Sequence, residues 1–354
     1  MGELFSSSLK LFDRRFVFVG LIPSLSLIGL VFGLIAAGAP ETAPSWQLFQ
    51  RELSDLKLVH VFLLLLPAVL LSILLQPFQL ALIRLLEGYW PDSFGWRKLT
   101  DLLGRRHEKE RLALQNKLNG SLNVYTYLLE YIEHYSKKHG KSKFVDLDRL
   151  VELRRFEVSR FGSRSIRYFP LRAPLLPTRL GNVLLAAEIH AGDSYGIDAL
   201  VIWPRLYPLL SDRLILILDE QRSRLDSAAS FAISFALAAL VSVLLLWTHY
   251  LWLLLPVGLA MLSWLGYRGA IAAALAYGET IRTAVDLHRF DLLRALHLPL
   301  PADEQEEKQL FELISSFLRQ GLPTDLCYKH DHPPKTGSVV DANNCSDRLN
   351  YGDG

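Results

Sequence analysis

The sequence predicts an all-α integral membrane protein, with four transmembrane helices in two hairpins, helical stalks and a mostly helical cytoplasmic domain. Four long apolar stretches occur in two pairs, at 16–39 and 58–75 and at 228–247 and 251–265. Crossing a hydrocarbon core of roughly 30 Å takes about 20 apolar residues in a helix. Hydrophobic residues make up 51% of the chain and mean hydropathy is +0.22, yet charged residues reach 21%. Part of the chain therefore lies in the bilayer and part in water.

The first hairpin is predicted within residues 1–86, with spans at about 16–38 and 58–79. Basic residues precede the first span, which is also typical of a cleaved signal peptide. Its apolar run is longer than the apolar core of a signal peptide, which has roughly 7 to 15 residues, and Pro40 is a poor residue to follow a cleavage site. We therefore expect the first span to be retained.

The orientation follows from the lysines and arginines that flank the spans, since cations are retained on the cytoplasmic side. Between the first two spans the only cations are Arg51 and Lys57, and the turn at 248–250 has none. The opposite flanks are rich in them: Lys10, Arg14, Arg15, Arg84, Arg97, Lys98, Arg213, Arg222, Arg268 and Arg282. The sequence predicts a bacterial inner-membrane protein with both termini cytoplasmic.

The second hairpin is predicted within 227–276, with spans at about 228–247 and 251–270 that continue as stalks. From Ser211 the chain has no glycine or proline until Pro256, so one helix enters the third span without a break. The helix from Pro256 to Leu296 would be roughly 60 Å long, and about half of it would protrude into the cytoplasm. Charges three apart on this stalk, Asp286 with Arg289 and Asp291 with Arg294, are interpreted as pairs on a solvated face.

Small residues recur at four-residue intervals on three spans, a pattern that lets membrane helices approach closely. They are Gly29 and Gly33, Ser230 and Ser234, and Gly266, Ala270, Ala274 and Gly278. Packing within the bundle is the favoured interpretation, and self-association of the chain is the alternative.

Residues 87–226 are interpreted as a cytoplasmic helical domain with helices at 98–138 and 146–161. The passage 164–177 holds three prolines and is not expected to form regular helix, after which Thr178 caps another helix. Residues 195–210 are read as a short strand or a buried turn. Residues 277–324 contain the stalk and an amphipathic helix that begins with an Asp303 capping box and is expected to dock on its own chain. Residues 325–354 are predicted to be a disordered tail.

A candidate ligand site lies around the proline-rich passage and the following helix N-terminus, where an anion can bind. Its residues are Arg179, Asn182, Glu188, His190 and Asp198. A satisfied structural network is the favoured alternative interpretation of these side chains.

The sequence contains no motif that indicates a metal, a cofactor or a catalytic residue. Glu188 and His190 are two apart and face different sides of a helix, unlike helical metal ligands. The tail residues Cys327, His330, His332 and Cys345 are interpreted as a chance grouping. No phosphate loop, serine elbow, kinase set or zinc quartet is present, which favours a protein that is not an enzyme.

Arginines are dense between positions 149 and 179. Beneath a membrane such a patch most often meets anionic headgroups. Nucleic acid is not a predicted partner, since binding it needs more aromatic platforms among the cations.

Three stretches, PTRLGNVLLAAE, YGIDALVIWPRL and YGETIRTAVDLHRFDLLRALHLPLP, resemble bacterial multi-pass membrane proteins without an assigned activity. The resemblance covers a minor part of the chain. It implies a bacterial inner-membrane setting and transfers no catalytic or binding residue.

Two classes of function fit the sequence. The first is an oligomeric membrane assembly, whether channel, pore-type effector or scaffold, with a cytoplasmic domain that senses or gates. The second is a membrane-anchored ligand-binding or catalytic domain around 179–198. A transporter is disfavoured, since no span carries a charge at mid-depth.

Overall fold

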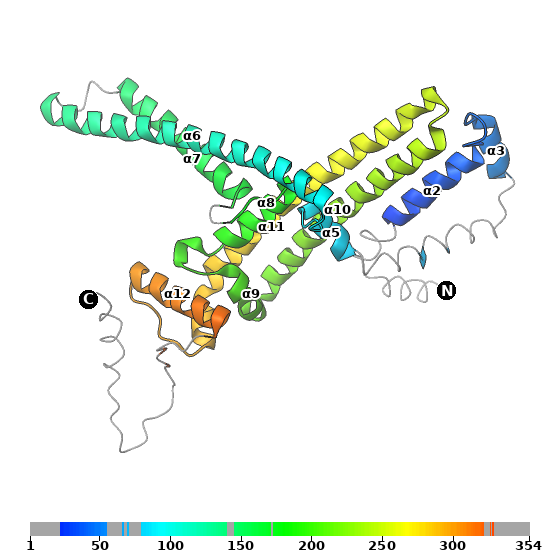
Figure 1. Ribbon diagram of the computed structural model, residues 1–354. Helices are drawn as coiled ribbons and strands as arrows, with labels where there is room; N and C mark the ends of the chain where they lie inside the picture. The colour runs from blue at the N-terminus through cyan, green and yellow to red at the C-terminus, as the bar shows by residue number, and fades with distance from the viewer. Residues whose placement is uncertain are drawn as a thin grey trace, which may run out of the picture. The chain divides into compact units, whose positions relative to one another are not determined.

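The computed structural model describes residues 22–54, 66, 69–70, 79–139, 145–170, 173–321, 326 and 328, and every regular element in these ranges is a helix (Figure 1). Two helical stretches there are long and apolar enough to cross a membrane, Asp212–Leu246 and Tyr250–Ala295. They contain the predicted fourth span and the predicted third span up to Leu246. A shorter apolar helix, α2 (Ile22–Ala36), lies in the predicted first span. Most of the predicted second span and of the tail after Asp325 lies outside the described residues.

The chain divides into two compact units, which are described separately. The first comprises residues 1–187 and 216–279, and the second comprises 188–215 and 280–354. The predicted domain boundaries follow the membrane rather than this division and stay a prediction.

Helices α10 (Asp212–Leu246) and α11 (Leu254–Ala295) are continuous through the lengths that the sequence predicts. The absence of glycine and proline within α10 leaves its hydrogen-bond ladder unbroken. In α11, Pro256 stands in the first turn, where a missing N–H costs no helical hydrogen bond. A short 3₁₀ turn, η5 (Tyr250–Leu253), joins the two helices.

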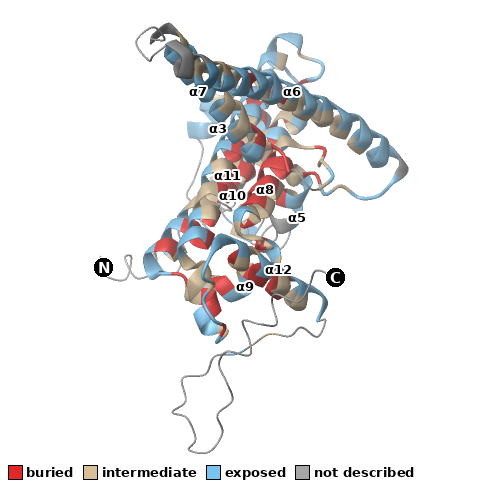
Figure 2. Cartoon of the chain, turned by 90° about the vertical axis from the view of Figure 1, so that its left-hand side faces the viewer, coloured by how far each residue is buried: buried red, intermediate tan, exposed pale blue. Residues whose placement is uncertain are grey.

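Small residues let α10 and α11 pack closely in the first unit. A Cβ added at Gly266 would lie 3.0 Å from the backbone nitrogen of Ala232, and Ser263 Oγ donates a hydrogen bond to the Ala232 carbonyl (2.7 Å). Ala270 and Ala274 have no exposed surface. They belong to a core built with α8 (Arg179–His190), where Figure 2 shows many buried positions. A Cβ added at Gly278 would press on Ala187 of α8 (2.6 Å).

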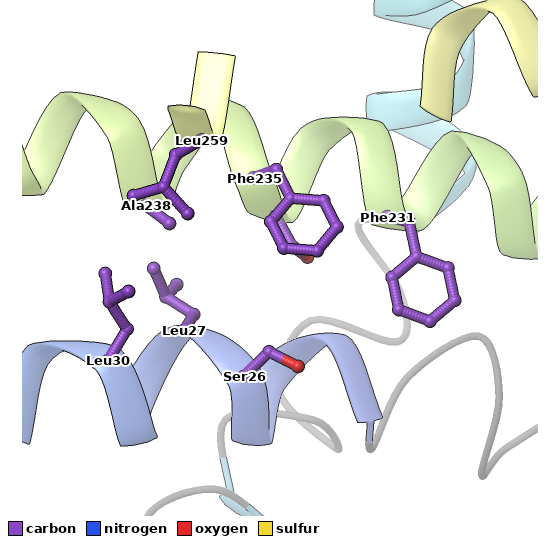
Figure 3. Close-up of a pocket in the computed structure, with 8 residues that line it drawn as sticks. Ser26, Leu27, Leu30, Phe231, Phe235, Ala238 and Leu259 are labelled. Carbon is purple, nitrogen blue, oxygen red and sulfur yellow. The ribbon is translucent and has the colours of Figure 1, made fainter. Parts of the chain in front are cut away.

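The other predicted small-residue positions are less crowded. A Cβ added at Gly29 would meet nothing within 4 Å, and one at Gly33 would make an ordinary contact with Phe49 (3.8 Å) of α3 (Trp46–Ser54). Ser230 and Ser234 are half-buried. Ser234 lines a small, largely apolar pocket where α2 faces α10 and α11 (Figure 3).

Helices α6 (Phe94–His139) and α7 (Val145–Tyr168) form a long hairpin in the first unit, and they run side by side in both views (Figures 1 and 2). Leu118 lies opposite Gly162, and Ser121 Oγ donates to Glu157 Oε2 (3.4 Å). The prediction for α6 is confirmed.

The predicted end of α7 at residue 161 is wrong, because the helix continues to Tyr168. The first proline of the passage is Pro170, and a proline restricts only itself and the residue before it. Regular helix is therefore excluded only after this point. The chain is then irregular until α8, where Thr178 Oγ1 accepts a hydrogen bond from the Gly181 N–H (3.1 Å) as a helix cap does.

The second unit contains η3 (Asp193–Tyr195), α9 (Ala199–Leu206), η4 (Tyr207–Leu209) and α12 (Glu304–Gln320), with the adjoining ends of α8, α10 and α11. The expectation of a strand or buried turn at 195–210 is wrong. Asp198 caps α9 by accepting a hydrogen bond from the Leu200 N–H (3.2 Å). The buried residues Ala199, Ile202 and Leu206 have helical spacing, which outweighs the presence of Pro204.

Helix α12 begins where the sequence predicts. Asp303 Oδ1 accepts from the Glu306 N–H (2.8 Å), and Gly321 ends the helix with a φ of 64° in the left-handed region. The helix packs on α9 and η3 through buried residues that include Phe311 and Ile314. The expectation that it docks on its own chain is confirmed.

Candidate functional site

The predicted site residues fall in both units. Arg179 and Asn182 belong to the first unit, and Glu188, His190 and Asp198 belong to the second.

Asn182 is fully buried and holds the proline-rich passage against α8. Its side-chain oxygen accepts from the Leu176 N–H (2.8 Å), and its amide nitrogen donates to the carbonyls of Leu176 and Thr178 (both 2.9 Å). Buried polar groups need such partners, so these bonds give Asn182 a structural task.

Arg179 reaches across to α6. Its Nη2 donates to Glu110 Oε2 (2.9 Å). Glu110 also attracts Arg106, with Nε 3.8 Å from Oε1, and His107, with Nδ1 3.9 Å from Oε2. One carboxylate on α6 is thus shared among three basic side chains.

Two further arginines adjoin this group. The guanidinium of Arg179 lies 5.6 Å from the ring centre of Tyr168, and that of Arg164 lies 5.8 Å from the same ring. Arg111 donates to Glu108 (2.7 Å) and to the Pro170 carbonyl (3.3 Å). We call the set Arg106, His107, Arg111, Arg164 and Arg179 the α6–α8 cation cluster.

Several nitrogens in the α6–α8 cation cluster are buried without a hydrogen-bond partner: His107 Nδ1, Arg111 Nε and Arg179 Nε. Burial lowers the pKa of His107 below its ordinary value of 6.5, against the opposing effects of Glu110 and of a hydrogen bond to the Pro177 carbonyl. The cluster has more donors than its carboxylates satisfy, and its chemistry suits an anion.

The second-unit residues are engaged locally. His190 Nδ1 lies 3.3 Å from Asp193 Oδ2. Asp198 caps α9, its N–H donates to Ser315 Oγ (3.1 Å) and its carboxylate pairs with Arg319 of α12. Glu188 lies half-buried in the last turn of α8. Asp198 therefore ties α9 to α12.

A second polar centre, around Arg289, was not predicted. Its Nε donates to the buried Glu307 Oε1 (2.6 Å), and its guanidinium lies 4.2 Å from the Tyr195 ring centre and 4.4 Å from that of Phe290. The predicted pair of Asp286 and Arg289 on a solvated face is wrong. Arg289 is largely covered, and the group of Asp286 to which it donates is the backbone carbonyl, not the carboxylate. The pair of Asp291 and Arg294 is present (3.0 Å).

Glu307 carried a signal that would have revealed the Arg289 centre. It occupies a position on the buried stripe of α12 with Leu310, Phe311 and Ile314, where an acidic residue needs a cationic partner. The Asp286 carboxylate instead accepts from the Tyr195 hydroxyl (3.0 Å). Burial first, and then this hydrogen bond, raise the pKa of Tyr195.

Comparisons with protein-family models, with curated proteins and with solved structures found no match to this chain. Within the described residues, no three histidine, cysteine or acidic side chains gather in a way that could hold a metal. The predicted chance grouping of Cys327, His330, His332 and Cys345 lies outside those residues.

Proposed function

We propose that this chain is a bacterial inner-membrane protein with four spans in two hairpins and cytoplasmic termini, and that its membrane part self-associates into an assembly that the cytoplasmic helices sense or gate. The observation that carries the proposal is the apolar surface left uncovered on α10 and α11. Within the most apolar window of each candidate span, only 33% of α10 and 11% of α11 are buried in the chain. Exposed apolar surface of this extent calls for lipid or a partner helix.

The contacts of α2 support a bundle that includes the first predicted hairpin. Leu34 of α2, Ala39 and Leu246 of α10 form one buried cluster. Ser26, Leu27 and Leu30 of α2 face Phe231 and Phe235 of α10 across the pocket of Figure 3. An apolar helix that packs along a candidate span fits a membrane helix of the same bundle.

The small-residue ridge of α11 is occupied within the chain, as shown by Gly266 against Ala232 and Gly278 against Ala187. Self-association would therefore use another face. Most residues on this part of α11 are exposed, and those on one face stand at alternating intervals of four and three, as a coiled-coil seam would need. They are Gly258, Leu262, Leu265, Gly269 and Ala272, which we call the α11 seam.

Mass measurement of the purified protein in detergent tests this proposal. We expect a discrete oligomer, with Gly258→Leu and Ala272→Leu shifting it toward monomer because bulky side chains separate the helices. Ala260→Leu is the matched control, since Ala260 is exposed on the opposite side of α11. A wild-type monomer would reject the assembly, and a channel additionally requires current across a planar bilayer.

The alternative function, a membrane-anchored domain that binds a ligand, is favoured by the α6–α8 cation cluster. Its buried donors without acceptors are a specific reason to expect an anion there. Arg164 and Arg179 of this cluster belong to the arginine-dense passage that the sequence predicts to meet anionic headgroups.

A further inference from the structure

The contact between α8 and α11 indicates how deep the α6–α8 cation cluster lies relative to the bilayer. The Leu180 N–H, next to Arg179, donates to Tyr267 Oη (3.2 Å) on α11. Tyr267 and Arg268 lie near the inner end of the predicted fourth span (251–270), and the Arg268 guanidinium lies 5.3 Å from the Trp264 ring centre. Tyrosine, tryptophan and arginine favour the level of lipid headgroups. Residue 180, and Arg179 with it, then lies at headgroup depth.

A separate part of the chain leads to the same depth. Helix α5 (Gln79–Glu87) follows the predicted second span and ends against α8. A Cβ added at Gly181 would overlap the Glu87 carbonyl, and one added at Gly88 would lie 2.8 Å from Pro177. The end of α5 and Tyr267, near the inner end of the predicted fourth span, therefore meet at the first turn of α8.

Charge at this place is unbalanced in favour of cations. Arg106, Arg111 and Arg179 share the carboxylates of Glu108 and Glu110, and a fourth arginine, Arg164, adjoins them at the Tyr168 ring. An excess of cations at this depth is attracted to the anionic inner leaflet.

The hydrogen bonds point to a missing acceptor. The Nε groups of Arg111 and Arg179 are buried without a hydrogen-bond partner, while both Nη groups of Arg111 and Nη2 of Arg179 are engaged. Unsatisfied buried donors in a polar cluster indicate an ion or water, and a cluster with a cationic excess selects an anion. A phosphate group carries several anionic oxygens and matches arginine geometry.

We propose that the α6–α8 cation cluster, at the inner headgroup level, binds the phosphate group of an anionic phospholipid, with Arg179, Arg111 and Arg164 as its main contacts. This inference rests on the proposed membrane location, because depth is what distinguishes a lipid phosphate from a soluble one.

Native mass spectrometry of the full chain, with phosphatidylglycerol or phosphatidylcholine added to detergent, tests the site. Wild type is expected to retain phosphatidylglycerol over phosphatidylcholine, and Arg179→Gln to weaken retention by about tenfold or more, the usual effect of losing a charge-assisted hydrogen bond. Arg164→Gln is a second variant that spares the fold because Arg164 is exposed. Arg160→Gln is the charge-matched control, an exposed arginine on α7 outside the cluster.

Equal losses in Arg160→Gln and in the cluster variants would overturn the site, because they would show diffuse attraction to charge. Equal retention of the two lipids would also overturn it. In a parallel arm, inorganic phosphate is added to lipid-free protein and thermal stability is recorded. Protection by phosphate that is lost in Arg179→Gln, without selective lipid retention, would assign the site to a soluble phosphate compound.

Extraction of membranes with alkaline carbonate separates failure of this inference from failure of the proposed function. Release of the protein by carbonate would reject the membrane location itself. Resistance to carbonate with lipid retention unchanged in Arg179→Gln and Arg164→Gln would reject only the phosphate site.

Discussion

Replacing Gly181 with alanine tests how tightly α5 and α8 meet beside the candidate site. Gly181 lies in the first turn of α8, where an added Cβ would overlap the Glu87 carbonyl oxygen, 2.9 Å from its carbon, and lie 2.8 Å from Leu176 Cδ1. Carbon atoms normally approach to about 3.5–4.0 Å, so the end of α5 would have to move by roughly 1 Å. The obstacle is backbone, which cannot rotate away as a side chain can.

The magnitude follows from two opposing effects. Glycine to alanine in a helix interior stabilises by about 1 kcal/mol. Overpacking costs about 1–3 kcal/mol, and a backbone obstacle places Gly181→Ala at the upper end. The net loss is about 2 kcal/mol, which lowers the melting temperature by about 4–8 °C in a unit of this size.

Gly120→Ala is the matched control, since Gly120 is in the interior of α6 and an added Cβ would meet nothing within 4 Å. We expect it to raise the melting temperature by a few degrees. Thermal unfolding of both variants in the same detergent, followed by circular dichroism, measures the difference. Equal stabilisation by the two substitutions would refute the close approach of α5 to α8.

Three further predictions concern single interactions. The pKa of His107 in the folded chain lies below 6.5, so the unfolded chain binds the proton more readily. The stability contributed by neutral His107 is therefore complete above about pH 6.5, and it falls as the pH drops toward the folded pKa. His107→Gln should remove that slope from melting curves measured between pH 7 and 5, and an identical slope in wild type and variant would contradict the assignment. Asn182→Ala should lower the free energy of unfolding by about 2–3 kcal/mol and speed proteolysis within residues 169–178, because Leu176 and Thr178 lose their buried partners. Asn123→Ala, on the exposed face of α6, should change neither the stability nor the rate of proteolysis. Glu307→Gln should weaken the contact of α12 with Arg289 and lower the free energy of unfolding by about 2–3 kcal/mol. Lys308→Gln, which breaks an exposed pair, should have no measurable effect. Similar losses of stability in both variants would show that burial does not distinguish the two pairs.

The errors of prediction share a cause. The three prolines after residue 164 predict an early end for α7. The helix nevertheless continues to Tyr168, because the first proline is Pro170 and it acts only on its own neighbourhood. At α9, Pro204 predicts a break, whereas the helical spacing of Ala199, Ile202 and Leu206 correctly indicates a helix. In both places, a local signal for breaking a helix was given more reach than its chemistry has.

The candidate site was only partly accessible to prediction. Arg179 was identified from its place after the proline-rich passage, but His107 and Arg111 were not, because they lie on a long helix whose polar face looks uniformly solvated in sequence. The Asn182 side chain offered no indication of whether a ligand or the backbone would satisfy it. The structure shows three backbone hydrogen bonds.

The sequence by itself determined the helical nature of the chain and the two apolar helices α10 and α11, because length, hydropathy and capping depend on residues near one another along the chain. Only the tertiary structure decided which partner each residue takes. Arg179 meets Glu110, 69 positions away, and Leu180 meets Tyr267, 87 positions away. Such pairs depend on how helices pack through small residues such as Gly181 and Gly266, and a contact of that kind leaves no periodic trace in the sequence.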